Sequence, residues 1–193
     1  MRRVAIFGGS FDPIHIGHAM IANYLSQCGM IDELWLMPGR VNPLKADHRP
    51  APDRHRLEMC RIVADRCVNV KVCDIEFAMP EPSYTCNTLS RLRELYPDTE
   101  FILLIGSDNW LIFDKWKNGD EILCNHRILI YPRPGCDVAP DSLPAGVTLL
   151  NDLPTAQISS TFIREGLKSG LNLNYLLPAA ILDYIISNNL YSQ

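Results

Sequence analysis

The sequence predicts an α/β protein of the doubly wound, Rossmann-like kind: a parallel sheet, helices on both faces and a small C-terminal helical segment. The first observation is that short apolar runs alternate with segments of helical periodicity along most of the chain. The second is that two apolar runs, 4–7 and 101–105, end directly in glycine, as buried parallel strands often do where they enter a loop. The third is that two helical segments close the chain.

Each expected element follows from its local pattern. We expect strands at 4–7, 33–37, 68–73, 101–105, 127–131 and 147–150. We expect helices from Gly17 onward with Gly29 as the stop, from 53 to at least 62, and over 84–96, 160–168 and 178–188. Prolines interrupt 40–52, which we expect to be an exposed loop, and 74–82 is expected to form a turn and an extended loop. Because no repeat, low-complexity stretch or flexible linker divides the chain, we expect a single domain over 1–193.

Composition narrows the class of function. Hydrophobic residues make up 47% of the 193 residues, which is enough for a continuous core, and the net charge of −4 argues against a general binder of nucleic acid or anionic membranes. No apolar stretch approaches the roughly 20 residues of a membrane span. The seven cysteines form no C-x-x-C pair and are interpreted as free, mostly buried thiols. We therefore expect a cytoplasmic protein that binds neither nucleic acid nor membrane, and composition leaves open whether it forms a homo-oligomer.

The segment 8–18, GGSFDPIHIGH, follows the first strand and opens a helix. It has neither the lysine of a Walker A loop nor the three-glycine dinucleotide pattern, but backbone N–H groups at such a helix start favour an anion. His15 and His18 are spaced to reach the same crevice mouth, where each can donate a hydrogen bond to phosphate and a protonated one would offset developing charge. The alternatives are two ordinary capping histidines, or a metal pair for which Asp12 is the one nearby carboxylate.

The segment 158–164, ISSTFIR, has the hydroxyl residues that cap a helix start. Arg164 then falls near the first turn, where the helix dipole disfavours a cation unless an anion occupies the same place. The alternative is a serine cap followed by a solvated arginine.

These two segments together resemble the nucleotidyltransferase superfamily, whose signatures are an H-x-G-H core after the first strand and I-S-S-T-x-I-R near the end of the domain. PSYT at 82–85 with TL at 88–89, GSDN at 106–109 and KW at 115–116 resemble the bacterial nicotinate-nucleotide adenylyltransferases within it. MP at 37–38, PLK at 43–45 and RLEM at 56–59 fall in that family's order, so the resemblance covers nearly the whole chain. Ser10 stands where threonine is common, and Leu44 where histidine is frequent.

The resemblance implies the nucleotidyltransferase fold and transfer of AMP from ATP to nicotinate mononucleotide, giving deamido-NAD and pyrophosphate in NAD biosynthesis. It implies that Mg²⁺ is carried with ATP and that no protein metal site is needed. The catalytic residues it implies are His15, His18 and Arg164. The ATP-binding residues it implies are Gly8, Gly9, Ser10, Phe11, Gly106, Asp108, Ile158, Ser159 and Ser160, and the acceptor-binding residues are Lys45, Tyr84, Thr85 and Trp116.

The chemistry of the central residues agrees with those roles. Trp116 can stack on a pyridine ring, while Tyr84 and Thr85 can present donors to its carboxylate. Asp108 can accept hydrogen bonds from ribose hydroxyls, and Lys45 can reach a phosphate. Packing, helix capping and plain solvation are the respective alternatives for Trp116, Asp108 and Lys45. Two rival functions stay open: a phosphopantetheine adenylyltransferase, and a non-catalytic adenine-nucleotide sensor.

Overall fold

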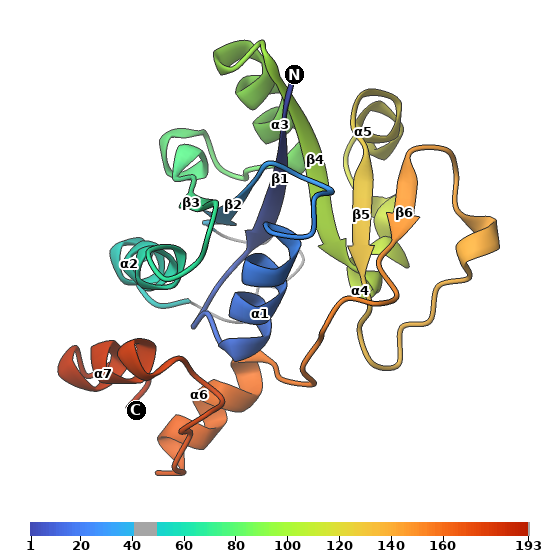
Figure 1. Ribbon diagram of the computed structural model, residues 1–193. Helices are drawn as coiled ribbons and strands as arrows, with labels where there is room; N and C mark the ends of the chain where they lie inside the picture. The colour runs from blue at the N-terminus through green and yellow to red at the C-terminus, as the bar shows by residue number, and fades with distance from the viewer. Residues whose placement is uncertain (41–49, 193) are drawn as a thin grey trace.

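The computed structural model describes residues 1–40 and 50–192, which contain a six-stranded sheet (Figure 1). All strand pairs are parallel, in the spatial order β3-β2-β1-β4-β5-β6. The predicted doubly wound fold is confirmed. The strands are β1 (Arg2–Gly9), β2 (Glu33–Pro38), β3 (Val70–Val72), β4 (Thr99–Gly106), β5 (Ile128–Tyr131) and β6 (Val147–Leu149).

Helices connect the strands and complete the C-terminal part of the chain. The α-helices are α1 (Ile16–Leu25), α2 (Asp53–Ala64), α3 (Thr85–Leu95), α4 (Ser107–Trp110), α5 (Gly119–Asn125), α6 (Ser160–Lys168) and α7 (Ala179–Ser187). The short 3₁₀ helices within residues 1–40 and 50–192 are η1 (Ile75–Ala78), η2 (Phe113–Lys115) and η3 (Pro140–Ser142). The chain begins at one end of the sheet and finishes beside α7 at the opposite end (Figure 1).

The sheet separates two hydrophobic cores because side chains alternate along each strand. Ala5 and Phe7 of β1 pack in a core with buried residues of α1, α2, α6 and α7. Val4 and Ile6 point the other way, into a core with buried residues of α3 and α5. Helices therefore cover both faces, which is why β1 and β4 read as continuous apolar runs.

Strand order reverses beside β1. The chain moves from β1 to β2 and β3 on one side, then returns to place β4 on the other side of β1 and continues to β5 and β6. Phe7 is in register with Leu36 of β2 and with Leu104 of β4, so the three carboxyl ends lie at one edge of the sheet. The crevice of a doubly wound sheet opens at such a reversal, and α1 starts there directly after the β1 loop (Figure 1).

Several predicted boundaries needed correction. The strand expected at 68–73 is only Val70–Val72, since Asn69 adopts a left-handed φ of 55°. The stretch expected to be a turn and extended loop contains η1. Helices α4 and α5 were not predicted, because four and seven residues are too few to display helical periodicity.

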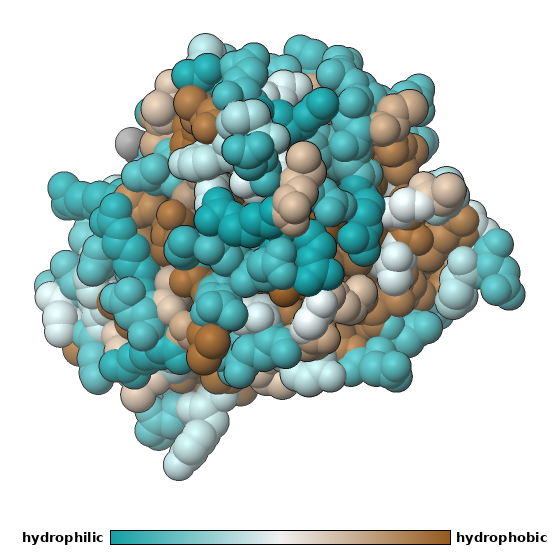
Figure 2. All heavy atoms as spheres, turned by 45° about the horizontal axis from the view of Figure 1, so that its top comes forward, coloured by the Kyte–Doolittle hydropathy of each residue, from teal (hydrophilic) through white to brown (hydrophobic). Residues whose placement is uncertain are grey.

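The exposed residues are mostly hydrophilic, as expected for a chain in which 21% of the residues are charged. On the face in Figure 2, hydrophilic residues cover most of the area and hydrophobic residues gather in several smaller areas between them. All seven cysteines are free thiols; three of them are buried, and Cys28 and Cys124 are exposed. Within the described residues, no helix has both the length and the apolar character needed to cross a membrane.

Candidate active site

The loop after β1 is shaped by an aromatic side chain turned inward. Phe11 is buried at 1% exposure with a left-handed φ of 44°, and its ring lies edge-on to His18 with centroids 5.1 Å apart. A Cβ atom on Gly9 would lie 3.2 Å from the Phe11 ring, so the glycine permits this turn. Phe11 therefore supports His18 from behind, while Gly8 at the end of β1 and Ser10 in the loop are exposed.

His15 and His18 form a stacked pair at the start of α1. Their ring centroids are 3.8 Å apart with an interplanar angle of 29°. The backbone N–H of His15 donates to Nδ1 of His18 at 3.3 Å, so the proton of a neutral His18 ring lies on Nε2. The spacing of three residues thus lets the His15 backbone fix the tautomer of His18, whose Nε2–H is left as a donor.

Both imidazoles are neutral at pH 7 in the ligand-free chain. Burial, reinforced by the charge of Arg133, lowers the pKa of His15 to about 4. Burial, with His15 and Arg133 as further causes, also lowers the pKa of His18 well below its usual value. The pair therefore offers N–H donors without a resident positive charge, and an incoming anion would raise both pKa values.

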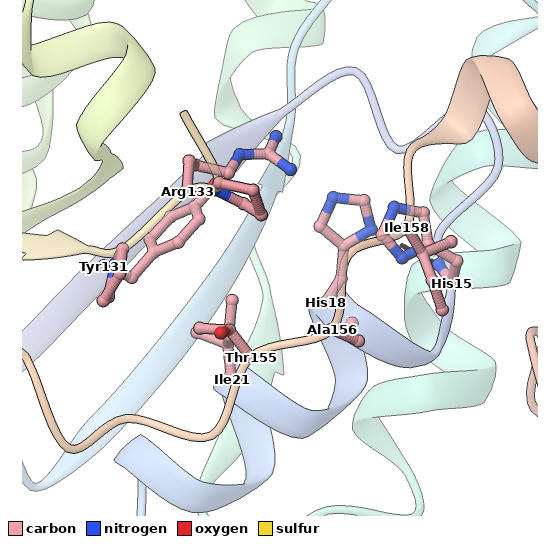
Figure 3. A pocket seen from close by; sticks show the side chains of 11 residues that line it. His15, His18, Ile21, Tyr131, Arg133, Thr155, Ala156 and Ile158 are labelled. Atoms are coloured by element: carbon pink, nitrogen blue, oxygen red, sulfur yellow. Dashed lines mark hydrogen bonds between the residues drawn. The ribbon is translucent and has the colours of Figure 1, made fainter. Parts of the chain in front are cut away.

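A pocket opens between these histidines, the end of β5 and the segment 155–158 that leads into α6. It encloses about 290 Å³, including its solvent-open mouth. His18 projects into it from α1, and the guanidinium of Arg133 extends toward His18 from the opposite wall (Figure 3). The other lining residues are His15, Gly17, Ile21, Tyr131, Pro132, Pro134, Thr155, Ala156 and Ile158. Donors and a cation that converge on one hollow suit an anionic ligand.

Gly106 allows α4 and the loop after β5 to approach each other. A Cβ atom at Gly106 would lie 2.3 Å from Oδ1 of Asp108 and 3.1 Å from both Arg133 and Tyr131. Oδ1 of Asp108 lies 3.5 Å from Nε of Arg133, a nitrogen with no hydrogen-bond partner among the described residues. The Arg133 backbone N–H donates to the Ser107 hydroxyl at 2.8 Å. The predicted ATP-site residues Gly106 and Asp108 are thus joined to the pocket through Arg133.

The segment 158–164 contacts the segment 8–18 although the two are far apart in the sequence. Ser159 caps α6 by accepting the Phe162 N–H at 3.1 Å, and Ser160 donates to the Pro13 carbonyl at 3.0 Å. Arg164 donates to the Asp12 carbonyl at 2.6 Å and lies 3.6 Å from the Asp12 carboxylate. The anion expected near Arg164 is therefore present within the protein, as the side chain of Asp12.

Asp12 is a buried hub, only 1% exposed. Oδ1 of Asp12 accepts the Ala51 backbone N–H at 3.0 Å and the Tyr191 hydroxyl at 2.6 Å. Burial and the neighbouring Asp12 raise the pKa of Tyr191, so its hydroxyl stays a donor. The C-terminal residues thus fix the geometry of the loop that carries the histidines.

The predicted acceptor residues lie at the start of α3 and after η2. Tyr84 precedes the first residue of α3, Thr85, and the Lys117 ammonium lies 4.2 Å from the Tyr84 ring centroid. Trp116 is half-buried with its ring 5.2 Å from that of Phe113, and its Nε1 has no hydrogen-bond partner among the described residues. The two predicted segments are therefore adjacent in space. Lys45 lies outside the described residues.

Sequence patterns indicate no role for Arg133 or Glu76, and they mark Arg56 only as part of a family block. Arg133 had a usable signal, since it is a cation directly after a predicted strand, set between two prolines. Arg56 is fully buried and donates to the Ser10 carbonyl at 2.8 Å, to the carbonyls of Ala51 and Gly39, and to Asp53. It ties together the loops after β1 and β2, which helical periodicity in α2 could not reveal.

Metal ligands do not cluster in the described part of the chain, where no three His, Cys, Asp or Glu side chains converge. Mg²⁺ binds few protein ligands and keeps water in nucleotide sites.

The fold and this phosphate-suited crevice define a nucleotidyltransferase, and the cytidylyltransferase-like family model matches residues 6–166. A probable nicotinate-nucleotide adenylyltransferase of Bacteroides fragilis is 45% identical over 95% of this chain and 91% of its own, and one of Flavobacterium johnsoniae is 38% identical over 99% and 100%. The chain belongs to the nicotinate-nucleotide adenylyltransferase family.

Solved structures show the same fold. A Plasmodium falciparum nicotinic acid mononucleotide adenylyltransferase complexed with NaAD superposes with a TM-score of 0.85, covering 99% of this chain and 98% of its own at 24% identity. A protein from Vibrio parahaemolyticus described as a putative nicotinate-nucleotide adenylyltransferase has a TM-score of 0.73 at 22% identity, covering 100% and 97%.

Proposed function

We propose that this chain transfers AMP from ATP to nicotinate mononucleotide and releases pyrophosphate. The observation that carries the proposal is the convergence of His18, Arg133 and the segment 155–158, which leads into α6, on one pocket at the carboxyl edge of the sheet. Family membership at 45% identity supports the same reaction. The product is deamido-NAD, and Mg²⁺ arrives as MgATP.

The phosphates of ATP occupy the pocket. His18 donates from Nε2 to the α-phosphate, and His15 contributes to the phosphate chain. Ser159, Ser160 and the start of α6 supply polar groups on one side, with Arg164 held there by Asp12. Arg133 supplies the cation opposite His18. Gly8, Gly9 and Ser10 let the backbone approach ATP, and Asp108 accepts hydrogen bonds from ribose.

The reaction is an in-line displacement at the α-phosphorus. An oxygen of the acceptor 5′-phosphate attacks, a new P–O bond forms, and the bond to the pyrophosphate leaving group breaks. The attacking phosphate is already an anion at neutral pH, so the protein needs neither a nucleophile nor a general base. Catalysis then depends on alignment and on stabilising charge as it spreads over the phosphoryl oxygens.

The pyridine nucleotide lies beside the start of α3. Trp116 stacks on the ring, Tyr84 and Thr85 provide donors, and Lys45 reaches the acceptor phosphate. Lys117 places a positive charge next to Tyr84, which favours the carboxylate of nicotinate over the uncharged amide of nicotinamide. The proposal therefore includes a preference for the acid form of the acceptor.

Pyrophosphate release tests this proposal. The purified protein is mixed with MgATP and, in parallel, with nicotinate mononucleotide, nicotinamide mononucleotide or phosphopantetheine. We expect the highest kcat/KM with nicotinate mononucleotide. A preference for phosphopantetheine would reassign the acceptor, and ATP binding without turnover of any acceptor would support the sensor function instead.

A further inference from the structure

Glu76 is a buried carboxylate that the proposed chemistry does not use. It lies in η1, after β3, with 7% of its surface exposed. Burial raises the pKa of its carboxyl group even though Ser83, Thr88 and Arg56 act in the opposite direction. A buried carboxylate destabilises the fold unless hydrogen bonds compensate its lost hydration. The hydrogen-bond partners of Glu76 therefore indicate its role.

Both oxygens of Glu76 are engaged by one short segment. Oε1 accepts the Thr88 hydroxyl at 3.0 Å, and Oε2 accepts the Ser83 hydroxyl at 3.0 Å. Thr88 itself is fully buried, and the Tyr84 carbonyl is a longer alternative acceptor for its hydroxyl at 3.3 Å. The carboxylate therefore grips the first turn of α3 on both sides of Tyr84 and Thr85.

The same carboxylate also touches the loop after β2. A Cβ atom at Gly39 would lie 3.0 Å from Oε2 of Glu76, so this backbone passes directly over the carboxylate. Gly39 is held by Arg56, whose guanidinium also binds the Ser10 carbonyl in the loop after β1. Glu76 thus connects the start of α3 to the frame that carries the ATP-side loops.

This arrangement explains the residues of the 82–89 motif to which the proposed function gives no role. In the run PSYT followed by TL, Tyr84 and Thr85 have proposed acceptor contacts, while Ser83 and Thr88 do not. The structure directs both of those hydroxyls to a single carboxylate. Ser83 and Thr88 are anchors, and Tyr84 and Thr85, which follow Ser83 directly, are the part of the motif left to face a ligand.

We propose that Glu76 is a positioning residue for acceptor specificity, which acts by fixing the Tyr84–Thr85 backbone through Ser83 and Thr88. The inference rests on the proposed acceptor site. Because the ATP-side contacts lie on other loops, loss of this grip weakens binding of the pyridine nucleotide and leaves ATP binding nearly unchanged.

Paired substitutions at Thr88 test the inference. Thr88→Val keeps the side-chain volume and removes the hydroxyl, whereas Thr88→Ser keeps the hydroxyl and removes a methyl group. We expect Thr88→Val and Glu76→Gln to raise KM for nicotinate mononucleotide about five- to tenfold, with less than a twofold change in KM for ATP. Thr88→Ser should keep the wild-type KM for the acceptor although it loses buried packing. Glu94→Gln, at the far end of α3, is the matched control and should match wild type.

The outcomes separate this inference from the proposed function. Wild-type turnover of nicotinate mononucleotide establishes the function on its own. If Thr88→Val and Thr88→Ser then raise both KM values equally, or if only the melting temperature changes, Glu76 is a packing residue and the inference is wrong. If wild type turns over a different acceptor, the same KM comparison with that acceptor still decides whether Glu76 positions the segment.

Discussion

The imidazole rings of His15 and His18 stack with centroids 3.8 Å apart, and Arg133 faces the same pocket from the opposite wall. Two imidazoles and a guanidinium therefore lie close together in a partly buried space. Burial and the charge of Arg133 lower the pKa of both histidines, which are neutral as a result. The ligand-free pocket is thus preorganised for a polyanion, whose charge would offset the crowding.

Replacement of His18 by alanine should remove catalysis and spare the fold. Because Nε2 of His18 is the proposed donor to the reacting phosphate, we expect kcat to fall roughly 100- to 1,000-fold. The partly buried ring lines the pocket and does not belong to the hydrophobic core, so the melting temperature should change by only a few degrees. Steady-state kinetics and thermal unfolding measure the two effects. His55→Ala, at a histidine that pairs with Tyr184 away from the pocket, is the control and should keep wild-type kcat. Parallel losses of stability and activity would argue for a structural role.

The lowered pKa of His15 makes stability depend on pH. Between pH 6.5 and about 4 the unfolded chain binds a proton at this residue that the folded chain does not bind. Acidification through that window should therefore lower the free energy of unfolding, by about 3 kcal/mol from this residue alone. Urea unfolding at several pH values measures it. His15→Gln should flatten this part of the profile, and an identical profile for both proteins would contradict the assignment.

Gly106→Ala should act through Asp108. A new Cβ atom would meet Oδ1 of Asp108 at 2.3 Å, and a carboxylate at the end of a short side chain can rotate away. We expect kcat/KM for ATP to fall roughly tenfold or more as Asp108 leaves its position beside Arg133. A double-mutant cycle with Asp108→Ala measures the coupling. The second substitution should add little to the first, and additive losses would show that Gly106 acts independently.

Trp116→Ala should weaken acceptor binding. Loss of ring stacking on the pyridine is expected to raise KM for nicotinate mononucleotide about tenfold, with little change in KM for ATP. Trp116→Phe keeps an aromatic face and should recover part of the loss. An unchanged KM in Trp116→Ala would remove this residue from the acceptor site.

Lys117 should contribute to the choice between acid and amide. Its ammonium lies 4.2 Å from the Tyr84 ring centroid and is exposed, so its charge is partly screened by solvent. We expect Lys117→Met to lower the ratio of kcat/KM for nicotinate over nicotinamide mononucleotide about two- to fivefold, and less at high salt. Lys115→Met removes an exposed charge two residues earlier and is the control. Equal losses for both acceptors would assign Lys117 to the shared phosphate instead.

Local patterns predicted those parts of the site that sit at strand ends. The glycines at the ends of β1 and β4 and the hydroxyl-rich start of α6 could be recognised because a few consecutive residues are enough to show each pattern. The bond from Tyr191 to Asp12 and the buried Arg56 could not, because their partners come from distant segments. Helix α5 is too short to show helical periodicity in the sequence. The position of Arg133 in the pocket could not be predicted without knowing which strand ends lie together.

The most direct test of the central claim is to measure pyrophosphate and deamido-NAD together in one reaction of the wild-type protein with MgATP and nicotinate mononucleotide. The account predicts equal amounts of the two products, neither of them formed when the acceptor is omitted. Release of pyrophosphate with AMP but no dinucleotide, or ATP binding with no product at all, would contradict it.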